Sequence, residues 1–181
     1  VYLSRRIIGL PSKTELFDNS NALKAKITYS YDEGNFSETG QTITPINHDS
    51  TNYGAGFIVG RGNATSSSRW DVTDPNNASK AITSRVKYNT AGSPVSSLDP
   101  LNREIKTSYT DNFDDSLNRN SFAYPTQITD PAGNSSTIKY RFDFGANVYA
   151  QSPAPAGNVE GKKTSRIYDD LGRLLKETVL N

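Results

Sequence analysis

The sequence has 181 residues, a formal net charge of +1 and no cysteine; this length fits one domain, and the lack of thiols excludes disulfides, thiolate metal sites and cysteine nucleophiles. Lys and Arg form no run, which argues against nucleic acid as a partner, because neutralising phosphates takes clustered positive charge. No apolar stretch approaches the ~18–20 residues that cross a bilayer, so we expect no membrane insertion.

The apolar fraction is 34%, which is low against the ~45–50% (a range that also counts Gly) of typical domains. Tyr is the most frequent aromatic residue, with ten copies, so we expect burial to depend on large amphipathic rings. The absence of Cys fits an exported bacterial protein and an extracellular or cell-surface location; a cytosolic protein that happens to lack Cys is the alternative. Residues 1–13 contain neither an initiator Met nor the long apolar region of a signal peptide, which predicts a mature product or an excised piece of a longer protein.

Residues 1–60 show the weakest pattern, and irregular strands and loops are expected there, with one half-buried strand where residues 25–31 alternate apolar and polar side chains. The loop-like stretch 45–56 holds the only histidine, His48, next to Asp49. Such a pair could orient an imidazole for general-base chemistry. Neighbours in an extended chain point to opposite faces, however, and no nucleophile motif accompanies them. We therefore expect a loop histidine and no enzymatic function.

Trp70 is the single tryptophan and follows Arg69. Two interpretations stay open. The ring could be a stacking platform for a sugar or a contact with a neighbouring subunit. The favoured alternative is a core residue packed on Val72.

One four-residue pattern recurs: Asp or Asn, two further residues, then Gly or Asn. An Asx side chain can accept a hydrogen bond from the N–H two residues on, and Gly or Asn tolerates the positive φ of a bulged hairpin. The pattern therefore predicts tight hairpin turns. The first and last residues of the four clearest matches are Asn89, Gly92, Asp99, Asn102, Asp130, Gly133, Asp169 and Gly172. Asp74 to Asn77 is a fifth match.

The segments between these turns alternate with period two, as in residues 82–88, 105–109 and 138–142, and Phe122, Tyr124 and Ile128 continue the pattern. Alternation predicts antiparallel strands with one packed and one wet face. We therefore predict an all-β fold, a meander of β-hairpins with little or no helix.

The stretch "YDDLGRLLKET" (168–178) leaves two interpretations at first, because Leu171, Leu174 and Leu175 have helical spacing. Comparison with the other turns favours a type I turn with a left-handed Gly172, followed by a strand. Leu174 and Leu175 would then face opposite ways, which fits a strand covered on both faces or one that awaits a neighbour.

Acidic residues gather in the loop-like stretch 111–120. Oxygen ligands in a loop are what Ca²⁺ requires, so the weak calcium candidates are Asp111, Asp114, Asp115 and Asn118. The stretch lacks the Gly and the closing Glu of an EF-hand, so solvated loop acidity is the favoured alternative, and no other cofactor is expected. Glu104 and Glu177 are expected as cross-strand partners of Lys or Arg.

These turns resemble the YD-repeat, or RHS-repeat, family. Residues 168–174 match its signature Tyr-Asp-x-x-Gly-Arg-Leu, residues 88–92 and 98–103 reproduce its alternation of two turn types, and residues 129–134 give another instance. The resemblance covers residues 60–181. It implies consecutive β-hairpins that join edge to edge into a long strip, which can roll up or coil like a solenoid. In that family such strips form shells that enclose toxin domains.

The sequence therefore predicts a single domain over residues 1–181, with irregular strands and loops in 1–60 and recognisable repeats in 61–181. The expected function is that of a structural module of an exported protein, which builds a sheet surface, shell or filament by edge-to-edge strand pairing. Its expected partners are further repeats of the same or identical chains. The alternatives are a segment of a toxin-enclosing shell, and a carbohydrate-binding or adhesin module whose exposed aromatics bind glycans.

Overall fold

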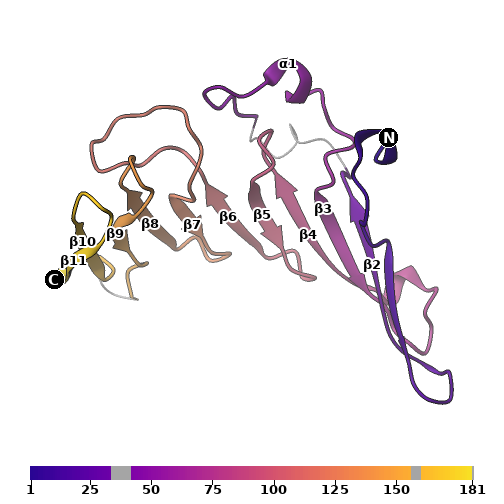
Figure 1. Ribbon diagram of the computed structural model, residues 1–181. Helices are drawn as coiled ribbons and strands as arrows, with labels where there is room; N and C mark the ends of the chain where they lie inside the picture. Colours follow the sequence, from indigo (N-terminus) through magenta and orange to yellow (C-terminus); the bar gives the residue numbers. More distant parts are fainter. Residues whose placement is uncertain (34–41, 156–159, 181) are drawn as a thin grey trace. The chain divides into compact units, whose positions relative to one another are not determined.

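The computed structural model describes residues 1–33, 42–155 and 160–180 (Figure 1). Its strands pair antiparallel in chain order, each with the next, in an 11-stranded sheet. The predicted all-β meander is thereby confirmed. The strands are β1 (Lys13–Phe17), β2 (Leu23–Tyr31), β3 (Ala64–Arg69), β4 (Ile82–Tyr88), β5 (Pro94–Leu98), β6 (Glu104–Ser108), β7 (Gln127–Thr129), β8 (Ser135–Tyr140), β9 (Asn147–Gln151), β10 (Lys163–Tyr168) and β11 (Leu174–Leu180).

Helical structure among the described residues is limited to single turns: α1 (Ser50–Tyr53) and the 3-10 turns η1 (Leu3–Arg5) and η3 (Ala78–Lys80). Asp49 caps α1, since its carboxylate accepts from Asn52 N at 3.1 Å. The Ser- and Thr-rich composition explains this scarcity, because β-branched and hydroxyl side chains favour strands and caps over helix interiors.

The chain divides into two compact units. Unit 1 comprises Val1–Thr44 and His48–Glu104, and unit 2 comprises Pro45–Asn47 and Ile105–Asn181. Unit 1 therefore contains β1 to β5, and unit 2 contains β7 to β11 with most of β6. The expectation of one domain over residues 1–181 stays a prediction.

Unit 1 has a largely polar interior. Val95 is its one buried large apolar side chain among the described residues, with 4% exposed. The other buried side chains of unit 1 are polar: Asp32, Thr65, Asn89, Thr90 and Ser96. Burial of such groups is tolerated when they are hydrogen-bonded. We therefore expect hydrogen bonds to contribute much of the stability of this unit.

Unit 2 is centred on Phe113, which has 2% of its surface exposed. Its ring packs edge to face against Phe142 at 5.2 Å and Tyr124 at 6.4 Å between centroids, and Tyr124 stacks on Tyr140 at 4.7 Å. The loop that contains Phe113 lies alongside the end of β8, where Tyr140 N donates to Asn112 O at 3.0 Å. The acidic stretch 111–120 thus supplies the main apolar contact of the unit.

Two boundary predictions for unit 2 are wrong. The strand expected over 138–142 ends at Tyr140, because Phe142 turns away to pack on Phe113. Phe122 and Tyr124 lie outside β7 (Gln127–Thr129). The predicted cross-strand role of Glu177 is confirmed, since its carboxylate lies 2.7 Å from Arg166 Nε on the neighbouring strand. Glu104 lies 3.8 Å from Lys87 Nζ, but Lys87 belongs to β4, with β5 between the two strands.

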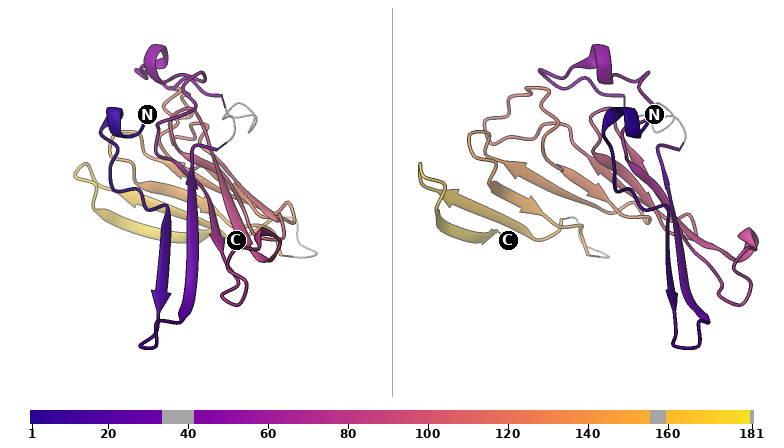
Figure 2. Two further views of the ribbon diagram at one scale, coloured as in Figure 1. Left: turned by 90° about the vertical axis from the view of Figure 1, so that its right-hand side faces the viewer. Right: turned by 45° about the vertical axis from the view of Figure 1, so that its right-hand side comes forward.

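Large apolar side chains remain exposed on the strands of both units. Examples are Leu16 in β1, Ile128 in β7 and Val179 in β11, which are 61%, 40% and 52% exposed. The β10–β11 hairpin, yellow in Figure 2, has β11 as its outer strand. Each unit thus presents apolar surface and strand edges of the kind that other β-proteins cover or block.

Candidate functional site

The turn after β10 shows what the repeated four-residue pattern does. Asp169 N donates to Arg173 O and Gly172 N to Asp169 O, each at 3.0 Å. Oδ1 of Asp169 accepts from Leu171 N at 3.0 Å and from Arg173 N at 2.8 Å. Gly172 has a φ of 76°, the left-handed conformation of a bulged hairpin. The hydrogen bonds from Arg173, its N–H above all, lower the pKa of Asp169.

The turns that begin at Asn89, Asp99 and Asp130 make the same bonds. In each, the N–H of the first residue donates to the carbonyl of the fifth at 2.9–3.1 Å. The side-chain Oδ1 of the first residue accepts from the third and fifth N–H at 2.8–3.0 Å. The fourth residue is left-handed, with φ between 59° and 88°. One side-chain oxygen therefore fixes each turn.

A fifth turn of this kind, which is not among those predicted from the sequence, lies between β1 and β2. Asp18 N donates to Ala22 O at 3.0 Å, and Asp18 Oδ1 accepts from Ser20 N and Ala22 N, both at 2.9 Å. Asn21 has a φ of 64°. The sequence Asp-Asn-Ser-Asn obeys the same rule, so the signal was present in the weakly patterned region.

The predicted turn at Asp74 is wrong in its geometry. Asn77 N does donate to Asp74 O at 3.1 Å, but Asn77 has a φ of −89° and caps η3 instead of turning left-handed. The Asp74 carboxylate accepts from Asn77 Nδ2 at 2.9 Å and pairs with Lys80 Nζ at 3.0 Å. The side chains that would shape a hairpin are thus used to start a helical turn.

Four strands end in a tyrosine whose hydroxyl donates to a backbone carbonyl at or just before the start of the preceding strand. The donor and acceptor pairs are Tyr31 and Pro11 (2.9 Å), Tyr88 and Ala64 (2.8 Å), Tyr140 and Pro125 (3.0 Å), and Tyr168 and Asn147 (3.1 Å). Burial raises the pKa of Tyr88 and Tyr140, so the donor form persists across the physiological range. We call this recurring contact the tyrosine latch. It fastens a strand to the one before it. After Tyr88 and Tyr168 an Asx turn, at Asn89 and Asp169, leads directly to the next strand.

A one-residue bulge accompanies each latch tyrosine. The strand that follows carries one extra residue just after the partner of the tyrosine. The extra residues are Thr65 in β3, Val95 in β5, Val148 in β9 and Leu175 in β11. Thr65 and Val95 are 8% and 4% exposed, whereas Leu175 is 65% exposed. The bulge also explains why Leu174 and Leu175 break the alternation expected of β11.

Asp32 follows the latch residue Tyr31 but has a different role from Asp169. Its carboxylate accepts the backbone N–H groups of residues 60–63 at 2.9–3.0 Å and the hydroxyl of Tyr2 at 2.9 Å. Burial opposes ionisation, but the bonds from Gly62 N, from the Tyr2 hydroxyl and from neighbouring N–H groups outweigh it and lower the pKa of Asp32. Burial first, and then the contact with Asp32, raise the pKa of Tyr2 to about 12. Asp32 thus organises a loop distant in sequence.

The calcium candidates do not form a common ligand set. Asp111 accepts from Arg119 N and Ser121 N, both at 2.9 Å, and from the Ser121 hydroxyl at 2.6 Å. Asp115 pairs with Arg119 at 2.6 Å, which lowers the pKa of Asp115 to about 2. The two remaining candidates bond within the loop, since Asp114 Oδ1 accepts from Asp115 N and Asn118 Oδ1 from Asn120 N. Within residues 1–33, 42–155 and 160–180, no three His, Cys, Asp or Glu residues gather in a group that could hold a metal ion.

The two other candidates from the sequence, Trp70 and His48, are half-buried, and each has a side-chain hydroxyl as partner. Trp70 is half-buried; its Nε1 donates to Thr28 Oγ1 at 2.9 Å and Lys26 Nζ lies 4.7 Å from its ring centroid. His48 is half-buried in its loop, with Nδ1 3.1 Å from Ser50 Oγ. Because Asp49 is engaged in capping α1, this His–Asp pair is not arranged as a catalytic pair.

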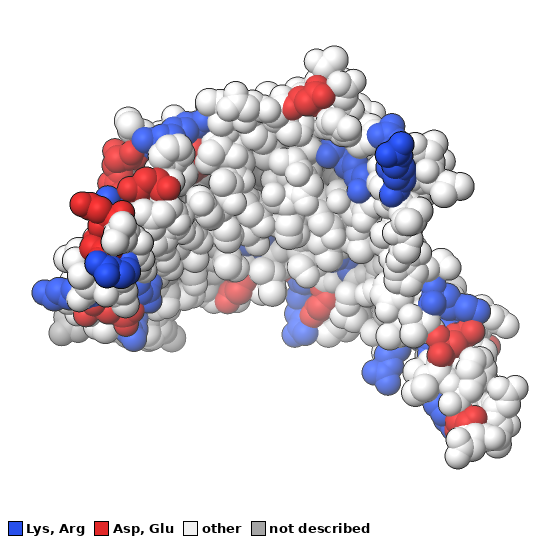
Figure 3. All heavy atoms as spheres, viewed as in Figure 1, with Lys and Arg blue, Asp and Glu red and all other residues white. Residues whose placement is uncertain are grey.

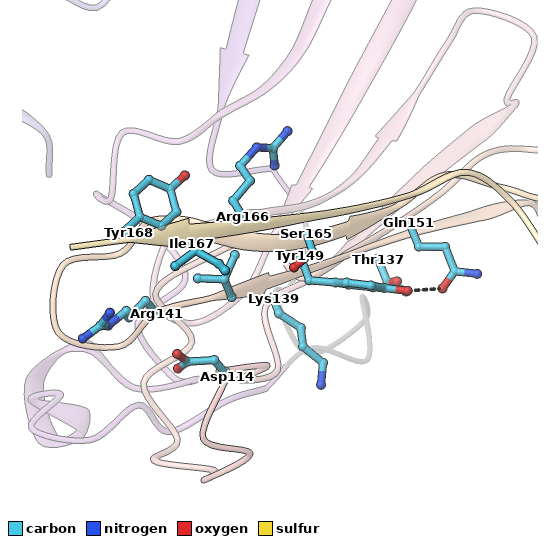
Figure 4. A pocket seen from close by; sticks show the side chains of 11 residues that line it. Asp114, Thr137, Lys139, Arg141, Tyr149, Gln151, Ser165, Arg166, Ile167 and Tyr168 are labelled. Carbon is cyan, nitrogen blue, oxygen red and sulfur yellow. Dashed lines mark hydrogen bonds between the residues drawn. The ribbon is translucent and has the colours of Figure 1, made fainter. Parts of the chain in front are cut away.

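A hollow of about 680 Å³ lies on strands β8 to β10 of unit 2. Lys139 and Tyr149 face each other across β8 and β9, and the Tyr149 hydroxyl donates to Gln151 Oε1 at 3.0 Å. Figure 4 shows these side chains and Ile167 on one side of the sheet, with Arg166 on the other. An aromatic ring beside an amide and an ammonium group could bind a polar, ring-shaped ligand such as a sugar.

Charges on the face shown in Figure 3 are mixed. Around the C-terminal strands, at the left of that view, Lys and Arg lie next to Asp and Glu. Ion pairs in the C-terminal strands and their turn include Arg166 with Glu177 at 2.7 Å and Arg173 with Asp169 at 2.6 Å. In the ranges that the structure covers, no helix has the length and apolar character needed to cross a membrane.

Comparison with known proteins adds no identification. No model of a known protein family matches this chain, and no curated protein is significantly similar to it.

Proposed function

We propose that this chain is a structural module that extends its β-sheet by pairing its edge strands with further β-strands. The recurrence of the latch tyrosine with a bulge supports the proposal, as does its combination with an Asx turn at Tyr88 and Tyr168, because these contacts join one strand to the next in the same way. We propose no enzymatic activity for this module. An exported, surface-located protein of the YD-repeat type, and a segment of a toxin-enclosing shell, are both consistent with such a role.

The observation that carries the proposal is the exposure of Leu175. It occupies the bulge position of β11, and the residues at this position in β3 and β5 are 8% and 4% exposed, whereas Leu175 is 65% exposed. β3 and β5 each have a strand on both sides, while β10 is the only strand paired with β11 among the described residues. β11 is therefore built like an interior strand that lacks one neighbour. An unblocked edge of this kind favours strand addition.

Sedimentation velocity of the chain over a range of concentrations tests the proposal. We expect self-association that weakens about tenfold in a Leu175→Glu variant, because a charge at the bulge position would have to be buried in the added sheet. Leu171→Glu is the matched control, since Leu171 is 79% exposed and lies in the turn rather than in β11. A wild-type chain that stays monomeric at ~1 mM would contradict the proposal, as would equal effects of the two variants.

A second candidate function is glycan binding at the hollow on β8 to β10, which the Tyr149–Gln151 pair favours. A glycan array probed with the labelled chain tests this candidate. Tyr149→Ala should abolish binding because it removes the ring, while Tyr53→Ala, an exposed tyrosine of α1 in unit 1, should leave binding unchanged. Absence of binding by the wild-type chain would rule this candidate out.

A further inference from the structure

The backbone N–H and C=O groups at the start of β11 point away from β10. Asp169 N donates to Arg173 O, so the next residue, Leu174, which is paired with Tyr168, directs its N–H and C=O outward by the alternation of an antiparallel ladder. The carbonyl of Leu174 is thus presented at the edge of the sheet.

Two interior strands place a carbonyl in the same way. Asn63 O accepts from Asp32 N at 2.9 Å and Ala146 O accepts from Arg141 N at 2.8 Å, so the following residues, Ala64 and Asn147, point their carbonyls outward. Those two carbonyls are the ones that accept the hydroxyls of Tyr88 and Tyr168. The Leu174 carbonyl is the equivalent acceptor in β11, and none of the hydroxyl groups placed by the structure donates to it.

We infer that β11 is a docking edge for an antiparallel strand that ends in tyrosine, whose hydroxyl donates to the Leu174 carbonyl while the strand covers Leu175. This inference rests on the proposed function and specifies its partner. The argument is continuity: the strands that follow β3 and β9 both end in tyrosine, at Tyr88 and Tyr168, and both complete this contact.

A second copy of this chain does not supply such a strand. The two edge strands among its described residues are β1 and β11. β1 ends at Phe17, directly before the turn residue Asp18, and β11 ends at Leu180. Phe17 stands where the latch tyrosine stands in β4 and β10, but it has no hydroxyl. The best-fitting occupant is therefore a strand of another segment with the pattern of β4; copies of this chain pair through β1 or β11 without the tyrosine contact.

Peptides with the sequence of residues 82–89, "ITSRVKYN", test the inference against the intact chain. Labelled wild-type peptide and a version with Tyr88→Phe are titrated by fluorescence anisotropy, and amide chemical shifts of residues 174–180 report the site. We expect the tyrosine peptide to bind about 3- to 10-fold more tightly than the phenylalanine peptide, the range of one neutral hydrogen bond. Binding of both should weaken with Leu175→Glu and not with Leu171→Glu.

The outcomes separate the inference from the proposed function. Equal affinity of the two peptides for β11 would overturn the tyrosine contact and leave strand addition intact. Absence of binding by either peptide would also overturn the inference, and the proposed function would then be judged by the sedimentation of the chain alone. Binding elsewhere than at residues 174–180, with a chain that does not self-associate, would overturn both.

Discussion

Single side-chain oxygens define five turns of this protein. In the turns that begin at Asp18, Asn89, Asp99, Asp130 and Asp169, Oδ1 of the first residue accepts hydrogen bonds from two backbone N–H groups. Asn89 shows that charge is not required, because its Oδ1 accepts from Ala91 N and Ser93 N at 3.0 and 2.9 Å, the geometry that Asp130 gives with Ala132 and Asn134. Asn89 is also only 1% exposed, a position where a carboxylate would be costly to ionise.

Gly172 is required for its backbone conformation rather than for space. A Cβ at this residue would lie 3.5 Å from the Phe144 ring, an ordinary contact, but φ is 76°. Gly172→Val should therefore lower the free energy of unfolding by ~1 kcal/mol or more, because β-branched residues tolerate positive φ poorly. Thermal melting measures the effect. Gly56→Val is the control, since Gly56 has open space and no positive φ. Equal melting temperatures for Gly172→Val and wild type would refute the turn geometry.

Asp18 should make stability depend on pH in the acid range. Hydrogen bonds, that from the Ser20 hydroxyl first, lower its pKa from 3.8 to about 2. The unfolded chain then binds the proton more tightly, so this contribution is present above about pH 4 and is lost as the pH falls through about 2. Asp18→Asn keeps an acceptor, as Asn89 does, and removes the titration. Urea unfolding at several pH values should show a flatter profile for Asp18→Asn between pH 4 and 2; an unchanged profile would contradict the assignment.

At the scale of elements, the sequence predicts what is local. Turns such as 130–134 depend on five consecutive residues, and strands show their alternation, so both are visible without the fold. Asp74 fails because Asn77 and Lys80, close by, offer its carboxylate other partners. The ring contacts of Phe113 with Tyr124 and Phe142, and the hydrogen bonds of the latch tyrosines, join residues 11 to 29 positions apart. The local sequence pattern does not predict these partners.

The tyrosine latch is expected to stabilise the sheet by about one hydrogen bond per copy. Tyr140 is the best site for a test, because its hydroxyl is part-buried and donates to Pro125 O at 3.0 Å. Tyr140→Phe keeps the stacked ring and should reduce the free energy of unfolding by ~0.5–1.5 kcal/mol. Tyr29→Phe serves as control, since its hydroxyl donates to no residue that the structure describes. Chemical denaturation of the two variants compares them directly; equal stabilities would show that the latch contributes nothing.

The whole molecule combines well-formed local bonds with little apolar burial. Val95 and Phe113 are the two buried large apolar side chains among the described residues, while Leu16, Ile128 and Leu175 remain exposed. Each unit therefore depends on its own few contacts: hydrogen bonds to Asp32 in unit 1, and the rings around Phe113 in unit 2. Strand addition at β11 would bury apolar surface that the chain alone leaves in water.

This organisation predicts that a destabilising substitution in one unit leaves the stability of the other unit unchanged. Phe113→Ala removes a nearly fully buried ring and should cost ~3–5 kcal/mol, whereas Leu117→Ala, at an exposed position of the same loop, should have little effect. Hydrogen exchange monitored residue by residue should show lost protection in β8 to β10 and unchanged protection in β3 and β4, because the two units have separate sets of internal contacts. Equal loss in both units would instead show one cooperative body, and would support the single domain over residues 1–181 that the sequence predicts.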